Sequence, residues 1–216
     1  MNIGLLFGRY LLTHPEKADQ SRRRIACIGD SITFGAGVFN TRKTDAWPVI
    51  LEGLLGKEYQ VLNYGVSGAT LQKEGDFPYY KIGFLKRLEN AEPERILLML
   101  GTNDSKPYNW DEKRYVKEYE ELIAEFSAFS WKPSVTLLVP PKAFSKKQTG
   151  VAAFDISDSV ISEKIHPLVL GIGKRYDLPV IDLYLFTEDH PEYFVDGVHP
   201  NSLGNRAIAE YLFQEL

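Results

Sequence analysis

One serine stands where a nucleophile could act. Ser31 lies in the stretch "IACIGDSITFGAG", in which an apolar run precedes it and small residues follow it. A serine hydroxyl is a weak nucleophile at neutral pH and needs a neighbouring base. Its backbone N–H, at the opening of a turn or helix, can also stabilise a developing negative charge. Gly-Asp-Ser is equally typical of a simple turn, so the motif alone does not decide.

A base could come from the stretch "FVDGVHPNSLGN" near the end of the sequence. Asp196 and His199 are three residues apart there. In a tight turn that spacing can bring the carboxylate against the imidazole ring, which fixes the ring tautomer and stabilises the protonated ring. The alternative is a loop before a helix in which His199 only caps the backbone.

Two further residues could donate hydrogen bonds to a ligand. Gly68, in "NYGVSGAT", can bring its backbone N–H close because it has no Cβ. Asn103, in "GTNDS", offers a neutral side-chain N–H. Each has a simpler interpretation, Gly68 as a turn glycine and Asn103 as an Asx-turn or a helix cap. A nucleophile, a base pair and two donors are together far less expected by chance than any one of them.

A second serine competes for the role of nucleophile. Ser67 lies in "GVSGA", a G-x-S-x-A frame close to the nucleophile elbow of α/β-hydrolases. Choosing it would leave Ser31 and Asn103 without roles, so we favour Ser31. Asp30 and Asp104 flank the candidate residues, and we expect them to orient the loops and not to react.

The elements that must position these residues alternate along the chain. Short runs that are apolar on both faces predict parallel strands at 24–30, 59–66, 95–101, 134–140 and 178–184. Helical spacing predicts helices over 47–55, with Asp45 as N-cap and Pro48 in the first turn, over 77–90, 115–126 and 203–212, and over 161–172 with a kink at Pro167. This alternation predicts a doubly wound α/β fold of about five parallel strands, in which ligands bind at the carboxyl ends of the strands.

Composition narrows the class of protein. The chain has 216 residues, of which 44% are hydrophobic and 25% charged, as is ordinary for a soluble globular protein. The net charge of −4 argues against nucleic acid or an anionic membrane as a main partner. Cys27 is the only cysteine, so no intrachain disulfide can form, and no Cys/His cluster predicts a metal.

The ends of the chain suggest one domain behind a short extension. We expect residues 1–23 to be an N-terminal extension and 24–216 a single domain, because no linker, repeat or low-complexity tract interrupts it. The extension could pack on the domain or on a second copy in a homo-oligomer. No window approaches ~18 unbroken apolar residues, and no clear cleavage site follows the first residues. We therefore expect a cytoplasmic protein with no membrane partner.

The candidate residues together resemble the SGNH (GDSL-type) hydrolase family. Its four blocks match "GDSIT", "NYGVSGAT", "GTND" and "DGVH", in the family's order and over most of the chain. The resemblance assigns Ser31, Asp196 and His199 to a catalytic triad, and Ser31, Gly68 and Asn103 to an oxyanion hole. One departure is Ile32, where the motif has Leu. The resemblance also implies a flavodoxin-like three-layer α/β/α sandwich, in agreement with the periodicity.

The activity that the resemblance implies is that of a serine esterase, or acylhydrolase, without cofactor or metal. "GTNDSKPYNW" is similar to the same stretch in GDSL-type proteins linked to carbohydrate deacetylation, such as sialate O-acetylesterases. We therefore expect a small-molecule ester substrate, with a small acyl group, acetyl, on a carbohydrate-like alcohol. Tyr108, Trp110 and Phe144 are the predicted substrate-binding residues. The long loop 141–159 contributes Phe144 and also Phe154, as a lid or specificity loop would.

Other functions stay open at this point. An acyltransferase, a lipase or a thioesterase could use the same triad. A non-catalytic carbohydrate-binding module could have the same fold, although intact Ser31, Asp196 and His199 argue against it. A flavodoxin-like FMN protein shares the layout, but it binds phosphate on a Ser/Thr-rich loop that "GDSITFG" matches only in part.

The choice between the two serines can be tested by comparing Ser31→Ala and Ser67→Ala on p-nitrophenyl acetate. We expect Ser31→Ala to lose more than the ~10²–10³-fold in turnover that removal of one oxyanion donor typically costs, because it removes the attacking atom. Ser67→Ala should keep most of the activity. An inactive Ser67→Ala enzyme beside an active Ser31→Ala enzyme would make the assignment wrong.

Overall fold

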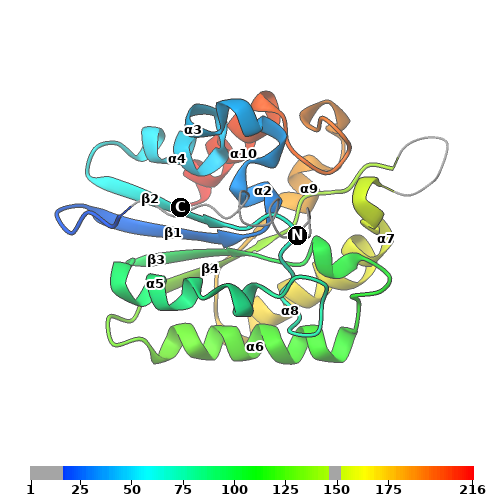
Figure 1. Cartoon of the computed structure of the whole chain (residues 1–216), viewed down its shortest axis with the longest axis horizontal. Coiled ribbons are helices and arrows are strands. Elements are labelled where there is room, and N and C mark those ends of the chain that lie inside the picture. The colour runs from blue at the N-terminus through cyan, green and yellow to red at the C-terminus, as the bar shows by residue number, and fades with distance from the viewer. Residues whose placement is uncertain (1–16, 146–151) are drawn as a thin grey trace, which may run out of the picture.

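Parallel strands form the centre of the molecule. The computed structural model describes residues 17–145 and 152–216. Within these residues a five-stranded parallel sheet runs in the order β2-β1-β3-β4-β5 (Figure 1). The strands are β1 (Arg23–Gly29), β2 (Tyr59–Gly65), β3 (Arg95–Met99), β4 (Ser134–Val139) and β5 (Val180–Asp182). The prediction of a doubly wound sheet is thereby confirmed. Of the predicted N-terminal extension, residues 1–16 lie outside the described residues.

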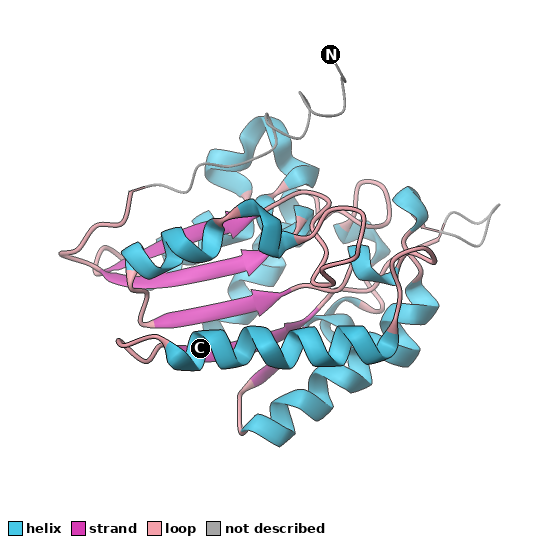
Figure 2. Ribbon diagram, turned by 60° about the horizontal axis from the view of Figure 1, so that its bottom comes forward, coloured by secondary structure: helices cyan, strands magenta, loops and turns pink. Residues whose placement is uncertain are grey.

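Helices cover both faces of the sheet and make the three layers visible in Figures 1 and 2. One face carries α3 (Arg42–Asp45), α4 (Trp47–Leu55) and α10 (Ser202–Glu215), and the other carries α5 (Phe84–Ala91), α6 (Glu112–Ala128) and α8 (His166–Tyr176). The short helices α2 (Ser31–Phe34), α7 (Asp158–Val160) and α9 (Leu183–Thr187) lie between strands and longer helices. Among the described residues, no helix is both long and apolar enough to cross a membrane.

The alternation of side chains along β1 creates a core on each side. Ile25 and Cys27 pack with Trp47 and Ile208 beneath α4 and α10, whereas Ile28 belongs to the cluster on the opposite face. All these side chains are almost completely buried. Burial of one large apolar side chain stabilises a fold by about 1.5–3 kcal/mol, so the two layers of helices hold the strand ends in fixed positions.

The carboxyl ends of the strands all meet at one edge, where the loops gather beyond the arrowheads in Figure 2. The strand order reverses between β1 and β3, because β2 lies on one side of β1 while β3, β4 and β5 lie on the other. The point of reversal opens a crevice between the loops that follow neighbouring strands. Ser31 begins α2 with one residue between it and the end of β1 at Gly29, and Asn103 lies in the loop after β3, which ends at Met99.

The predicted N-cap of the first long helix is wrong. Asp45 is the last residue of α3, and its carboxylate accepts hydrogen bonds from Thr44 Oγ1 (2.8 Å) and Ser202 Oγ (2.9 Å). The backbone N–H of Trp47, which opens α4, donates instead to Asn205 Oδ1 at 3.0 Å. Asn205 belongs to α10 and is fully buried. A partner 158 residues away in the chain therefore does what a local carboxylate was expected to do.

Three other predicted elements differ in detail from the structure. The strand predicted over 178–184 ends at Asp182, because its carboxylate accepts from Leu185 N (3.0 Å) and starts α9. A π-helical turn, Ile161–Ile165, precedes Pro167 where a kink was predicted, and the proline falls in the first turn of α8. The helix predicted over 77–90 is shorter: a 3₁₀ turn (Tyr79–Ile82) and Gly83 precede α5.

The role of Asn205 can be measured as stability. Asn205→Ala leaves the buried N–H of Trp47 without an acceptor, and it also removes the donor that Nδ2 gives to Pro200 O (2.7 Å). We expect the free energy of unfolding to fall by about 2–3 kcal/mol, measured by urea denaturation. Gln214→Ala, an exposed position on the same helix, is the control and should stay within about 0.5 kcal/mol. Equal stabilities of the two variants would contradict this role.

Candidate active site

A continuous line of hydrogen-bonding groups joins Ser31, His199 and Asp196. His199 Nε2 lies 2.9 Å from Ser31 Oγ, and His199 Nδ1 lies 2.7 Å from Asp196 Oδ2. Ser31 begins α2 directly after β1, and Asp30 accepts from Ile32 N (2.9 Å) to fix that turn. A serine, an imidazole and a carboxylate in this order can activate the hydroxyl as a nucleophile.

The carboxylate of Asp196 closes the turn that carries His199. Asp196 Oδ1 accepts from the backbone N–H groups of Val198 (2.9 Å) and His199 (2.8 Å), while Oδ2 faces the ring. Gly197 between them has a φ of +90°, a conformation that glycine adopts without steric cost. A Cβ at Gly197 would lie 2.2 Å from the carbonyl oxygen of Phe144. The motif "DGVH" therefore needs its glycine for both conformation and space.

The same contacts set the charge on Asp196. Burial raises the pKa of this carboxyl, but the hydrogen bonds from the His199 ring and from the backbone outweigh it and lower the pKa to about 2. Asp196 is therefore ionised at any pH near neutrality. A fixed negative charge at Nδ1 favours the tautomer that presents a bare Nε2 to Ser31.

The two predicted donors lie beside Ser31. Gly68 and Asn103 line the same pocket as Ser31 and His199. Asn103 Nδ2 donates one hydrogen to Ala69 O at 3.1 Å, and a side-chain amide has a second hydrogen to offer. Asn103 O accepts from Asn109 Nδ2 (2.9 Å), which fixes the turn after β3. The strand ends therefore bring together all five residues that the sequence predicted for the triad and the oxyanion hole.

Asp30 and Asp104 orient the loops, as expected. Asp104 accepts from the backbone N–H groups of Leu71 (2.9 Å) and Gln72 (2.8 Å), and so joins the loop after β2 to the loop after β3. Both carboxyls are completely buried, and burial raises the pKa of each from 3.8 to about 6, against the hydrogen bonds that lower it. Each side chain thus holds a loop of the site through backbone N–H groups, and neither is among the residues that line the pocket.

The pocket at Ser31 has a volume of about 310 Å³. Its lining mixes polar and apolar side chains: Ser31, Ala36, Ser67, Gly68, Thr102, Asn103, Lys106, Phe154, Ile156, Val198 and His199. Ser67, the competing nucleophile, is among them. Its Oγ is buried and has no hydrogen-bond partner within the part of the chain that the structure describes. Nothing described there activates it, whereas Ser31 contacts an imidazole.

The three residues predicted to bind substrate do not line this pocket. Trp110 is partly buried and packs against Tyr115 of the core, with ring centroids 5.4 Å apart. Tyr108 is exposed, 5.8 Å from the amine of Lys106. Phe144 supports the His199 turn, because its N–H donates to Gly197 O at 2.8 Å. The prediction that these three residues bind substrate is therefore wrong for this pocket. Phe154, the other aromatic residue of loop 141–159, does line it. Residues 146–151 of that loop lie outside the described residues.

A histidine beside a carboxylate is not in itself distinctive in this chain. His166 lies 2.6 Å from Asp182, and His190 lies 2.8 Å from Glu192. Of these imidazoles, His199 is the one whose second nitrogen meets a serine hydroxyl. Over residues 17–145 and 152–216, no group of three or more His, Cys, Asp or Glu side chains is arranged to hold a metal ion.

Comparison with known proteins agrees with the motifs. Residues 27–207 match the GDSL-like Lipase/Acylhydrolase family. An acetylxylan esterase from Xylanibacter ruminicola is 33% identical over an alignment of 224 positions, which covers 95% of this chain and 45% of that protein. The chain therefore spans less than half the length of this curated relative.

Solved structures share the fold. A carbohydrate acetylesterase family member from Sinorhizobium meliloti is similar with a TM-score of 0.72 and 23% identity, over 89% of this chain and 96% of that one. A lipase/acylhydrolase from Enterococcus faecalis gives a TM-score of 0.67 and 25% identity, over 89% of this chain and 94% of that one.

The buried Asp30 makes stability depend on pH. Its pKa of about 6 in the folded protein lies above the ordinary value of 3.8, so the folded state holds a proton that the unfolded state releases in this range. The wild type should therefore lose stability as pH rises from about 4 to about 6. Asp30→Asn keeps an acceptor for Ile32 N–H but does not titrate.

The measurement is the free energy of unfolding of both proteins between pH 4 and pH 7. We expect the value for Asp30→Asn minus that for wild type to become more positive with pH, by on the order of 2–3 kcal/mol. Parallel curves would contradict a raised pKa at Asp30.

Proposed function

The chain belongs to the GDSL-like lipase/acylhydrolase family, and we propose that it is a carboxylic ester hydrolase that removes a small acyl group, acetyl, from a carbohydrate-like alcohol. The observation that carries the proposal is the line of contacts from Asp196 through His199 to Ser31, which opens on a pocket with Asn103 and Gly68. Within residues 17–145 and 152–216, Ser31 is the one serine whose hydroxyl forms a hydrogen bond with a histidine.

In the proposed reaction Ser31 Oγ attacks the carbonyl carbon of the ester. His199 Nε2, at 2.9 Å, takes the hydroxyl proton as attack proceeds. Asp196, whose low pKa keeps it charged, holds the ring and stabilises the imidazolium that forms. The His199–Asp196 pair is only partly buried, and His199 lines the pocket at Ser31.

The negative charge that develops on the carbonyl oxygen needs donors that are already in place. The backbone N–H groups of Ser31 and Gly68 and the side-chain amide of Asn103 are assigned to this role. Asn103 is held by its contacts with Ala69 and Asn109, so its amide needs no rearrangement during attack. His199 then gives its proton to the leaving alcohol, and water repeats the cycle on the acyl-enzyme to release the acid.

The choice of substrate rests on the pocket and on the relatives. A pocket of about 310 Å³ that includes Lys106, Thr102 and Asn103 has room for a polar alcohol beside a short acyl group. The relative with 33% identity is called an acetylxylan esterase, and a structure with the same fold is called a carbohydrate acetylesterase family member. Both names support acetyl on a sugar for this chain.

A series of p-nitrophenyl esters from acetate to octanoate, together with acetylated xylose, tests the proposal, with Ser31→Ala as the blank. We expect kcat/KM to be highest for acetate and at least about tenfold lower for octanoate, because the pocket of about 310 Å³ must hold the acyl chain together with the alcohol. A chain too long for its space costs about 1–3 kcal/mol. Preference for octanoate would contradict the small acyl group. Activity that survives in Ser31→Ala would contradict the hydrolytic mechanism itself.

A further inference from the structure

Phe154 is a large apolar side chain that is mostly exposed, so burial in the core does not explain its place in the structure. Its side chain is 61% exposed, although it lines the pocket at Ser31. Its ring meets the ring of His199 edge-on, with centroids 5.1 Å apart and an angle of 68°. Phe154 and Asp155 both have left-handed backbone conformations, with φ of +62° and +60°, which residues other than glycine seldom adopt. A strained backbone thus holds a largely exposed aromatic ring against His199.

The chemistry determines which half of the ester lies near this ring. The acyl carbon bonds to Ser31, and its oxygen turns to Gly68 and Asn103. The leaving oxygen must lie next to His199 Nε2, because that atom gives it a proton. A side chain that packs on the His199 ring and lines the same pocket, as Phe154 does, therefore lies nearer the alcohol than the acyl group.

We propose that Phe154 is the platform of a leaving-group subsite that takes the pyranose ring of an acetylated sugar. This inference rests on the proposed function. The C–H groups of a pyranose face are apolar and slightly positive, and they pack well on the negative face of an aromatic ring. A simple alkyl alcohol has no such face. Phe154 therefore sets specificity for the alcohol.

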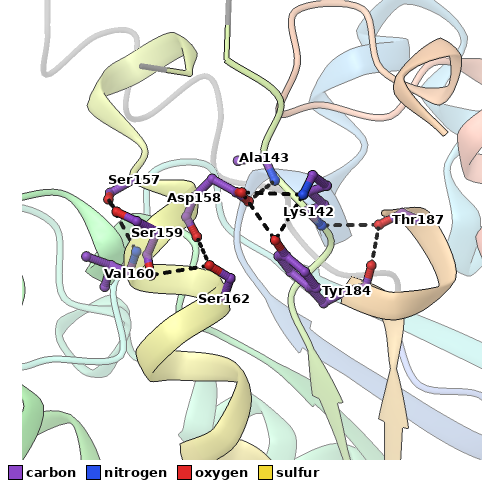
Figure 3. Close-up of polar contacts among 9 residues, drawn as sticks. All are labelled: Lys142, Ala143, Ser157, Asp158, Ser159, Val160, Ser162, Tyr184 and Thr187. Atoms are coloured by element: carbon purple, nitrogen blue, oxygen red, sulfur yellow. Dashed lines mark hydrogen bonds and ion pairs between the residues drawn. The ribbon is translucent and has the colours of Figure 1, made fainter. Parts of the chain in front are cut away.

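The segment that carries Phe154 is held on its C-terminal side by Asp158, whose contacts are drawn in Figure 3. Asp158 Oδ1 accepts from Ala143 N at 3.0 Å, and Asp158 Oδ2 accepts from Tyr184 OH at 3.2 Å. Lys142 Nζ lies 3.6 Å from the same carboxylate and 3.2 Å from Tyr184 OH. Asp158 thus ties the segment to the loop after β4 and to α9, which makes it a positioning residue.

A second attachment links the segment to the oxyanion side of the pocket. Ser157 N donates to Ser105 Oγ at 3.1 Å, and Ser105 Oγ donates to Thr102 O at 2.7 Å. Ile156 between Phe154 and Ser157 is buried. The backbone on the C-terminal side of Phe154 is therefore fixed relative to Asn103, as a subsite requires.

The test compares xylose tetraacetate, which has a sugar ring, with ethyl acetate, which has none, by acetate release from the full chain. For Phe154→Ala we expect the ratio of kcat/KM for xylose tetraacetate to kcat/KM for ethyl acetate to fall about three- to tenfold, mainly through KM. Phe154→Tyr should restore the ratio, and Phe154→Leu should not. All three are side chains with a Cβ, so the backbone strain stays matched. Phe213→Ala, another exposed aromatic, on the outer end of α10, is the control.

The positioning role of Asp158 is tested in a double-mutant cycle. Asp158→Ala should lower the same ratio, but it should add little to Phe154→Ala, because it acts through that ring. An unchanged ratio in Phe154→Ala, an equal fall for both esters, or the same fall in Phe213→Ala would overturn the subsite. Additive losses would overturn the role of Asp158.

The failure of this inference is distinguishable from failure of the proposed function. If wild type releases acetate from ethyl acetate and Ser31→Ala does not, the hydrolase stands, and the ratio alone decides the subsite. If Ser31→Ala is as active as wild type, the proposed function fails first. A protein that hydrolyses ethyl acetate but not xylose tetraacetate would also overturn the subsite.

Discussion

The contact between His199 and Ser31 is the constraint on which the site depends. The two residues are 168 positions apart, so no local turn can bring them together. Their meeting requires that the loop before α10 lie against the end of β1. The buried layer formed by Trp47, Ile208 and the β1 side chains fixes this packing. The geometry of the candidate active site is thus a consequence of how one helical layer packs on the sheet.

Close contacts at Gly37 and Asn205 fix the position of the His199 loop within that packing. A Cβ at Gly37 would lie 2.2 Å from Pro200 O, so the chain after α2 and the chain after His199 touch backbone to backbone. Asn205 donates to the same Pro200 O while it accepts from Trp47 N. The start of α4, the start of α10 and the His199 loop are therefore one unit. A change in any of them would move the imidazole relative to Ser31.

The features that could be predicted from the sequence are those whose determinants lie within a few residues of each other. The strand that ends just before Ser31 and the tight turn that joins Asp196 to His199 each depend on a few neighbouring residues, and both were predicted. The requirement for glycine at position 197 was not, because it comes from the approach of Phe144. Prediction from the sequence failed where a partner comes from far along the chain. Asp45 was the best local cap, but Asn205 reaches Trp47 N from α10. No spacing rule encodes that contact.

The same limit explains the aromatic residues. Phe144 and Phe154 lie in one loop and look equivalent in sequence, but the first supports the turn of His199 and the second meets its ring. The difference arises from the left-handed backbone at Phe154 and Asp155. The residue types do not mark that conformation at Phe154, since bulky residues seldom adopt it, although aspartate, as at Asp155, adopts it more often than most. It is maintained by contacts at Ser157 and Asp158, which over-determine the segment. Strain of this kind persists where surrounding contacts hold it, and here they hold it at the mouth of the candidate active site.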